Sequence, residues 1–172
     1  MTAQKRPPFK ISGTAEIKHL NVRKEGPDDE KVLAVDLKLL FTKLDFRICL
    51  YFDEALPAFL WRSEAESLSL IARNAYLQPV AYANEIEGAT VEIEGHGFRG
   101  CDVKKFAILP RDGGVVDLTC SVSLYPTTYE VGDLSKLVQD GARVSIEGPP
   151  DLFDGNAGEE AARGRTAAAE VE

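Results

Sequence analysis

Residues that commonly carry catalysis or bind metal ions are scarce in this chain, which has two histidines and three cysteines among 172 residues. Neither His19 nor His96 has a serine, cysteine or acidic partner at a spacing that identifies a catalytic pair. We therefore predict that the protein is not an enzyme and that it has no catalytic residues, no metal site and no cofactor.

The cysteines are Cys49, Cys101 and Cys120, an odd number with no C-x-x-C pair. Each one lies among apolar residues in a stretch that we expect to be a strand. This placement is typical of small, buried side chains in a reducing compartment, rather than of a redox or metal site.

Long apolar runs are also missing. Residues 1–9 are polar and contain no apolar core of a signal peptide, and no stretch reaches the length of a membrane span. We therefore expect a soluble, cytoplasmic protein with no membrane partner.

The chain has fewer basic than acidic residues, with 20 Lys and Arg against 28 Asp and Glu, for a net charge of −8. Binding to nucleic acid depends on Lys and Arg that neutralise phosphates, so this balance opposes diffuse binding. A local basic patch on an acidic body remains compatible with it.

The main positive signal is a repeated pattern. Residues 15–22 (AEIKHLNV) and 101–108 (CDVKKFAI) both read small, acidic, β-branched, Lys, basic, large apolar, variable, β-branched. Each copy is followed by a turn and then by a stretch of alternating apolar residues, at 32–41 and 116–124. Because apolar residues two apart share one face of a strand, we predict two related β-hairpins.

Inside each first strand the alternation slips by one residue, from Ile17 to Leu20 and from Val103 to Phe106. A β-bulge absorbs such an extra residue, so we predict bulges at Lys18-His19 and at Lys104-Lys105. The connecting turns differ: 111–114 contains Asp-Gly, which suits a tight hairpin, whereas 25–30 is longer, acidic and expected to be exposed. The acidic turn lacks the spaced carboxylates and closing Glu of a calcium loop.

Shorter sequence patterns predict the remaining strands and helices. Alternating apolar residues at 44–52 predict a third strand after a bend at 42–43, and Asp53 and Pro57 predict the start of a short helix. We expect this helix to be held to the sheet by Phe59, Leu60 and Trp61. Further along, we expect strands at 89–94 and 143–147, with a two-turn helix between Tyr129 and Gly141 that uses Leu134, Leu137 and Val138 as its apolar side.

The expected fold is mainly β (α+β), with antiparallel sheets from two pseudo-repeated hairpin units and two short helices, as a sandwich or a partly open barrel. The pseudo-repeats span about 9–62 and 89–148. They form one domain at 9–150, between a flexible N-terminal arm at 1–8 and a disordered Ala/Glu-rich tail at 151–172.

Two groups of residues are candidates for binding nucleic acid or a protein partner. Lys18, Lys104 and Lys105 occupy matching places in the two repeats and could neutralise phosphates, while Arg73, Tyr76 and Tyr82 could supply a cation and base-stacking rings. The alternatives are lysines that prevent edge-to-edge pairing of strands, and a packed connecting segment at 73–83.

Several motifs also occur in the order seen in one protein family: 32–39 (VLAVDLKL), 78–80 (QPV), 101–106 (CDVKKF), 113–118 (GGVVDL) and 137–139 (LVQ). On these motifs, most of residues 9–150 resembles a family of small β-rich proteins from the early region of bacteriophages and prophages, of largely unknown function. The resemblance implies a role beside phage replication and recombination in the cytoplasm of a host cell. It supplies no catalytic residue.

From the residues and the resemblance together, we expect a non-enzymatic, phage-type accessory binding protein in DNA replication or recombination, with weak contact to single-stranded DNA. Two other functions stay open: a protein–protein inhibitor of a host defence complex, and a self-assembling structural subunit. A protein partner or a homo-oligomer is expected in each case.

Overall fold

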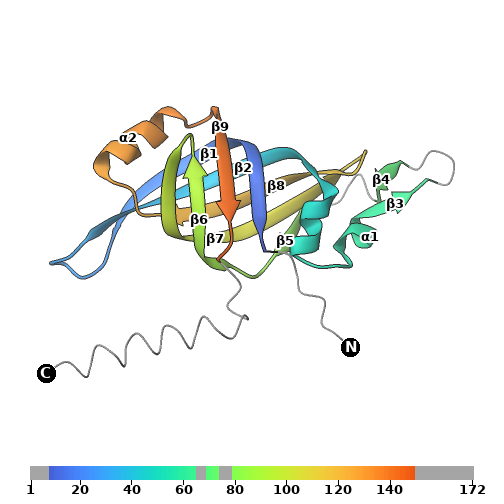
Figure 1. The fold of residues 1–172 in the computed structure, drawn as a ribbon, viewed down its shortest axis with the longest axis horizontal. Helices are drawn as coiled ribbons and strands as arrows, with labels where there is room; N and C mark the ends of the chain where they lie inside the picture. The colour runs from blue at the N-terminus through green and yellow to red at the C-terminus, as the bar shows by residue number, and fades with distance from the viewer. Residues whose placement is uncertain (1–7, 65–68, 74–78, 150–172) are drawn as a thin grey trace, which may run out of the picture.

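The structure is a computed structural model that describes residues 8–64, 69–73 and 79–149 (Figure 1). It is mainly β, as expected. The larger sheet has seven antiparallel strands: β1 (Lys10–Glu25), β2 (Val32–Asp45), β5 (Val80–Tyr82), β6 (Ile86–Ile93), β7 (His96–Arg111), β8 (Val115–Leu124) and β9 (Gly141–Glu147). A two-stranded sheet and three short helices complete the described chain: β3 (Trp61–Ser63), β4 (Leu70–Ala72), η1 (Phe46–Tyr51), α1 (Leu56–Leu60) and α2 (Thr128–Lys136).

Strand pairing in the larger sheet runs round a ring. The order is β5-β7-β6-β9-β1-β2-β8, and β8 pairs back with β7. The bonding is ring-like without making a complete barrel, which agrees with the partly open barrel, one of the two architectures expected. Both ends of the described body meet at the start of β1, where Gly148 N–H donates to the Phe9 carbonyl at 2.7 Å.

The inside of the ring is the hydrophobic core. Apolar side chains alternate inward along each strand: β8, for example, buries Val116, Leu118, Cys120, Val122 and Leu124. The residues between them, such as Thr119 and Ser121, face outward and are half-buried. Burial of each large apolar side chain contributes on the order of 1.5–3 kcal/mol, which makes this alternation the main determinant of the fold.

Both predicted hairpins form, and both predicted bulges are present. β1 pairs with β2, and the register shifts between Ile17 and His19. β7 pairs with β8, and the register shifts between Lys104 and Ala107, with Lys105 at a φ of 55°. The bend expected at 42–43 is a third bulge in β2, where Lys43 also has a φ of 55°.

The predicted strand at 44–52 is wrong beyond Asp45, because residues 46–51 form the 3₁₀-helix η1. The Asp45 carboxylate accepts a hydrogen bond from the Arg47 N–H at 2.9 Å and starts the helix. The apolar residues at 46, 49 and 52 are three apart and share one face of a 3₁₀-helix, and the latter two are buried. The apolar residues of this segment fit both a two-residue and a three-residue period, and the structure follows the three-residue period.

The boundaries of both α-helices also differ from the predicted ones. Asp53 accepts from the Ala55 N–H at 2.7 Å, but the N-cap position of α1 is Ala55 itself. Phe59 is 62% exposed, so it does not hold α1 to the sheet, whereas Leu60 and Trp61 are buried as expected.

The second helix, α2, starts with a capping box between Thr127 and Glu130. Of the predicted apolar side only Leu134 lies in the helix, where it is buried; Leu137 is the C-cap and Val138 follows it, although both pack against the core. Gly141 does not end the helix, because α2 stops at Lys136 and Gly141 begins β9. No helix in the described ranges is long and apolar enough to cross a membrane.

Candidate binding site

The outer face of four neighbouring strands carries a polar hollow of about 480 Å³. The strands are β1, β2, β8 and β7, which lie side by side in the ring. The hollow is lined by His19, Asn21, Asp36, Leu37, Lys38, Lys105, Ala107, Thr119 and Ser121. Most of these residues carry a hydrogen-bond donor, so the hollow suits an anionic ligand.

A row of cross-strand neighbours forms the basic side of this hollow. Lys104 lies opposite Ser121, Ser121 lies opposite Lys38, and Lys38 lies opposite His19. Neighbouring strands are roughly 4.8 Å apart, so the row extends about 14 Å across the strands. It brings residues far apart in the sequence onto one surface.

The two bulges place His19 and Lys105 on this face. A bulge adds a residue to one strand and changes the direction of the side chains next to it. The matching bulges of β1 and β7 therefore contribute to the same hollow from its two outer strands, His19 from one and Lys105 from the other. The two copies of the repeated sequence pattern thus contribute residues to the same surface.

The predicted lysines differ in their surroundings. Lys105 lines the hollow and Lys104 is a half-buried member of the row. Lys18 is outside the hollow, and its Nζ lies 3.0 Å from Glu16 Oε2 in an ion pair. Lys38, which we did not single out from the sequence, takes the place expected for Lys18.

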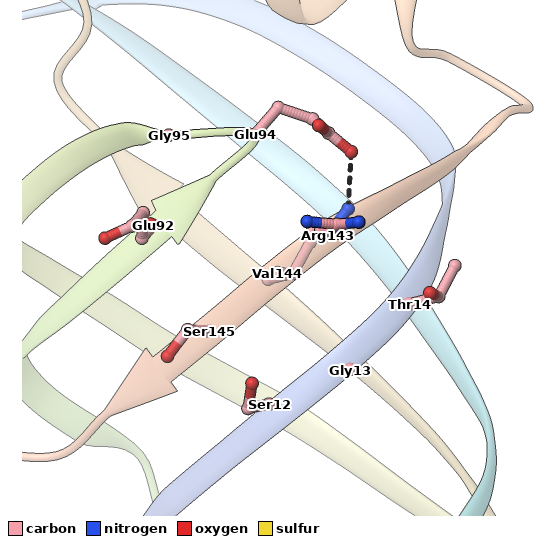
Figure 2. Close-up of a pocket in the computed structure, with 9 residues that line it drawn as sticks. All are labelled: Ser12, Gly13, Thr14, Glu92, Glu94, Gly95, Arg143, Val144 and Ser145. Carbon is pink, nitrogen blue, oxygen red and sulfur yellow. Dashed lines mark hydrogen bonds between the residues drawn. The ribbon is translucent and has the colours of Figure 1, made fainter.

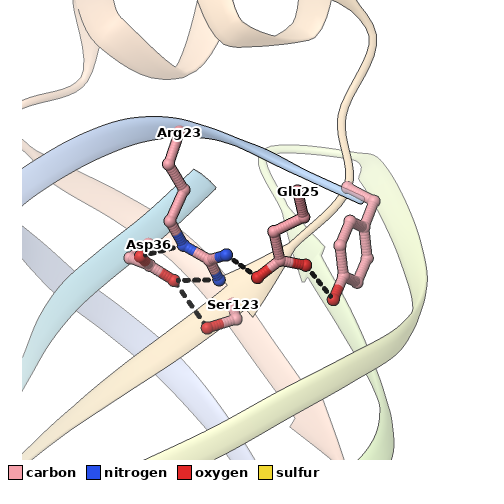
Figure 3. Close-up of polar contacts among 5 residues, drawn as sticks. Arg23, Glu25, Asp36 and Ser123 are labelled. Carbon is pink, nitrogen blue, oxygen red and sulfur yellow. Dashed lines mark hydrogen bonds and ion pairs between the residues drawn. The ribbon is translucent and has the colours of Figure 1, made fainter. Parts of the chain in front are cut away.

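The charges of Lys38 and Lys105 are not neutralised by an ion pair with any described residue. The acidic residue in the hollow, Asp36, has its own partners (Figure 3): Arg23 Nε and Nη2 donate to its carboxylate at 2.7 and 3.1 Å, and Ser123 Oγ donates at 2.6 Å. These hydrogen bonds, that from Arg23 foremost, hold the pKa of Asp36 below its usual range, with a smaller contribution from the charge of Lys104. The hollow is therefore left with a positive excess.

The second predicted group does not come together with the lysines. Arg73 lies beside α1, where its Nε donates to the Ala58 carbonyl at 3.1 Å. The Tyr82 ring packs edge-on against Phe52 and Phe106, at centroid distances of 4.9 and 6.1 Å, as part of an aromatic cluster on the core. Tyr76 lies outside the described residues. Trp61 is buried, and its Nε1 donates to the Arg111 carbonyl at 2.9 Å, which is the role of a core anchor.

A larger hollow, of about 640 Å³, lies on the outer face of β1, β9 and β6 (Figure 2). Its charged lining residues are Glu92, Glu94 and Arg143, so carboxylates outnumber cations. The Glu94 carboxylate turns toward β9 and accepts from the Arg143 backbone N–H at 2.7 Å. Because this hollow lacks a positive excess, it suits an anion less well than the first.

The cysteines and histidines form no reactive pair in the part of the chain that the structure describes. Burial raises the pKa of Cys49 and Cys120 to about 12 and that of Cys101 to about 11, so these thiols are protonated at neutral pH. His96 Nε2 lies 3.6 Å from Asp133 Oδ2, away from His19 in the hollow. No group of three or more His, Cys, Asp or Glu among the described residues is placed to hold a metal ion.

The sequence contained a signal for Lys38 that only the strand order makes visible. Asp36 and Lys38 alternate with buried Leu37 and Leu39, so both were recognisable as outward residues of one strand. Comparison with protein-family models, curated proteins and solved structures found no match for this chain.

Proposed function

We propose that this protein is a non-enzymatic accessory binding protein that holds single-stranded nucleic acid weakly in the hollow on β1, β2, β8 and β7. The observation that carries the proposal is the basic row Lys104–Ser121–Lys38–His19, with Lys105 beside it. A setting in phage-type DNA replication or recombination follows from the sequence resemblance and is part of the proposal.

The chemistry of the hollow favours contact with the sugar–phosphate backbone. Lysines neutralise phosphates, and the hydroxyls of Thr119 and Ser121 and the amide of Asn21 can donate hydrogen bonds to phosphate oxygens. No Phe, Tyr or Trp side chain lines this hollow among the described residues, so only the imidazole of His19 offers a ring for base stacking there. Binding should therefore be independent of sequence and strongly reduced by salt.

The number of lysines sets the expected salt dependence. For single strands, the logarithm of the binding constant falls with the logarithm of salt concentration by about 0.7 per phosphate neutralised. Three lysines therefore predict a slope of about −2. The net charge of −8 opposes long-range attraction and keeps the affinity low.

The test is a fluorescence-anisotropy titration of a labelled oligothymidylate at low salt. We expect weak binding by the natural chain, and at least a tenfold loss for the double variant Lys38→Glu/Lys105→Glu. The matched control is Lys10→Glu/Lys136→Glu, which changes the net charge equally at exposed positions outside the hollow, and it should lose no more than about threefold. An equal loss in both variants, or no binding at tens of micromolar protein, contradicts the proposal.

A self-assembling protein is the second candidate function. It is favoured by the part of the β1–β2 hairpin that extends beyond the ring, where Val32 is 53% exposed beside Tyr125, which is 43% exposed. Large apolar side chains that lie together on a surface are typical of contact sites. The inhibitor of a host defence complex stays a prediction from the sequence alone.

A further inference from the structure

The hairpin of β1 and β2 continues past the ring as a two-stranded arm, residues 23–34, seen at the left of Figure 1. The pairing of β2 with β8 ends at Val35 opposite Leu124, whereas β1 and β2 stay paired as far as Glu25 opposite Val32. Three further residue pairs carry the turn at 26–31 roughly 10 Å beyond the ring.

One face of this arm continues the face that carries the hollow. Residues directly opposite each other on paired strands share a face, so the pairs 19/38, 21/36, 23/34 and 25/32 belong to one face, on which Ala34 is fully covered. Tyr125 joins this face, because its hydroxyl donates to Glu25 Oε2 at 3.1 Å.

The outward face changes in character from one end to the other. The hollow contributes Lys38 and Lys105, neither of which forms an ion pair with a residue in the described ranges. In the middle, Arg23 forms ion pairs with both Asp36 and Glu25, and Tyr125 exposes apolar surface. Val32 exposes further apolar surface next to the turn. At the tip, residues 28–30 are three consecutive exposed acids, and among the described residues only Asp28 has an ion-pair partner, Lys31.

We propose that two copies of this chain associate through this face about a two-fold axis. The arm of each copy lies across the hollow of the other, with the acidic tip beside Lys38 and Lys105. Tyr125 lies near the axis, and Val32 lies between the axis and the tip. Such an isologous contact needs a surface that complements itself when rotated by half a turn, and a basic–apolar–acidic order has this property. Because of the two-fold symmetry, each favourable charge contact occurs twice in the dimer.

The occupant of the hollow is a second copy because the tip cannot reach the hollow of its own chain. The paired strands direct the tip away from the ring, and Lys38 is six residues from Val32 along β2, roughly 20 Å. The inference rests on the same hollow as the proposed function, but on its charge alone. It implies that the arm of the partner copy competes with nucleic acid.

Charge reversal tests the inference without nucleic acid present. The tip variant is Asp28→Lys/Asp29→Lys/Glu30→Lys, and the hollow variant is Lys38→Glu/Lys105→Glu. By sedimentation equilibrium at low salt, we expect the natural chain to be a dimer that salt dissociates, and each variant alone to be a monomer. An equimolar mixture of the two variants should form a heterodimer, because each tip then meets a hollow of opposite charge.

The mixture also shows that both variants are folded, and the control variant Glu54→Lys/Glu85→Lys/Glu87→Lys should remain dimeric because these exposed acids lie outside the arm. A natural chain that is monomeric at 200 µM (on the order of the weakest specific contacts), or a mixture that stays monomeric, overturns the inference. If the natural chain dimerises but binds no oligonucleotide even at a dilution that leaves it monomeric, the proposed nucleic-acid function is removed and the inference stands. A monomer that binds oligonucleotide does the reverse.

Discussion

The two hairpins share a bulged first strand, yet their turns have opposite surroundings. The β7–β8 turn is enclosed on one side by β4 and η1, although Arg111, Asp112 and Gly113 are exposed. Ala72 N–H donates to Asp112 Oδ1 at 2.9 Å, Gly113 N–H donates to the Leu70 carbonyl at 2.8 Å, and Phe46 N–H donates to the Gly114 carbonyl at 2.9 Å. The β1–β2 turn has a local hydrogen bond, from Glu30 N–H to the Pro27 carbonyl at 2.9 Å. A bulged hairpin thus stabilises the fold through its turn in β7–β8, whereas in β1–β2 its turn remains available for contact with other molecules.

The residues of each turn account for this difference. Gly114 has a φ of 72°, so the tight turn needs glycine for its conformation, and a Cβ at this position would also displace the Leu70 side chain, whose Cδ1 would lie 2.9 Å away. The β1–β2 turn is acidic and has little to bury, so it stays at the surface. The contrast can be tested by variants that affect stability at the enclosed turn and leave stability unchanged at the arm.

The largest effect is expected from Trp61→Ala, which removes the side chain that joins β3 to the enclosed turn. Trp61 is 3% exposed and donates to the Arg111 carbonyl, so we expect a loss of about 3–5 kcal/mol in the free energy of unfolding. Urea denaturation measures it, with Phe59→Ala as the control, because Phe59 is largely exposed and should cost less than about 0.5 kcal/mol. A cost below 1 kcal/mol for Trp61→Ala would show that the turn is not anchored in this way.

A smaller effect concerns pH, at the point where the arm meets β8. Hydrogen bonds from Arg23 and Ser123 lower the pKa of Asp36, so this carboxylate stabilises the folded protein above its unfolded pKa of about 3.9. That contribution is lost as the pH falls through the lower, folded pKa. Urea denaturation between pH 2.5 and 6 (a window set about the carboxylate pKa values) should show a shallower loss for Asp36→Asn than for the natural chain.

The pH dependence should become shallower without disappearing, because the pKa values of Asp45 and Glu130 are also lowered, by hydrogen bonds from Arg47 and from the Thr127 backbone. If the natural chain and Asp36→Asn lose stability in parallel on acidification, the carboxylate does not hold the base of the arm.

The smallest effect separates the two turns directly. Asp112→Ala removes the acceptor of the Ala72 N–H and should cost about 1 kcal/mol, as for a typical hydrogen bond. Asp28→Ala removes a side chain with an exposed ion pair, and its cost in a dilute, monomeric sample should be close to zero. Thermal unfolding of the two variants side by side measures this, and equal costs would contradict the contrast.

The sequence predicted local features of the fold better than long-range ones. Both bulges were predictable because they follow from a slip in alternation within single strands, at Ile17 to Leu20 and at Val103 to Phe106. The 3₁₀-helix at 46–51 was not, because its apolar residues fit periods of both two and three. Gly141 was taken for the end of α2, although Gln139 adopts the positive φ that follows the helix, at 67°.

The candidate site was predictable only in part, for a similar reason. Lys104 and Lys105 were visible through the repeat, whereas Lys38 became part of the site only because β2 and β8 pair in this register. Strand order in a sheet depends on contacts between segments that are distant in the sequence. The alternation of apolar residues within one strand does not show which other strand it will pair with. Arg73 and Tyr82, by contrast, are close in sequence but are held by different partners, the Ala58 carbonyl and the core rings.

The hydrogen bond between Gly148 and Phe9 has a practical consequence for engineering. It puts both ends of the described body at the start of β1, while the arm leaves from the opposite end of the same strand. Fluorophores or surface tethers attached near either end would therefore stand clear of the arm and the hollow. A circular permutant that links residues 9 and 148 and is opened within the acidic turn would keep the ring of strands while cutting the arm at its tip.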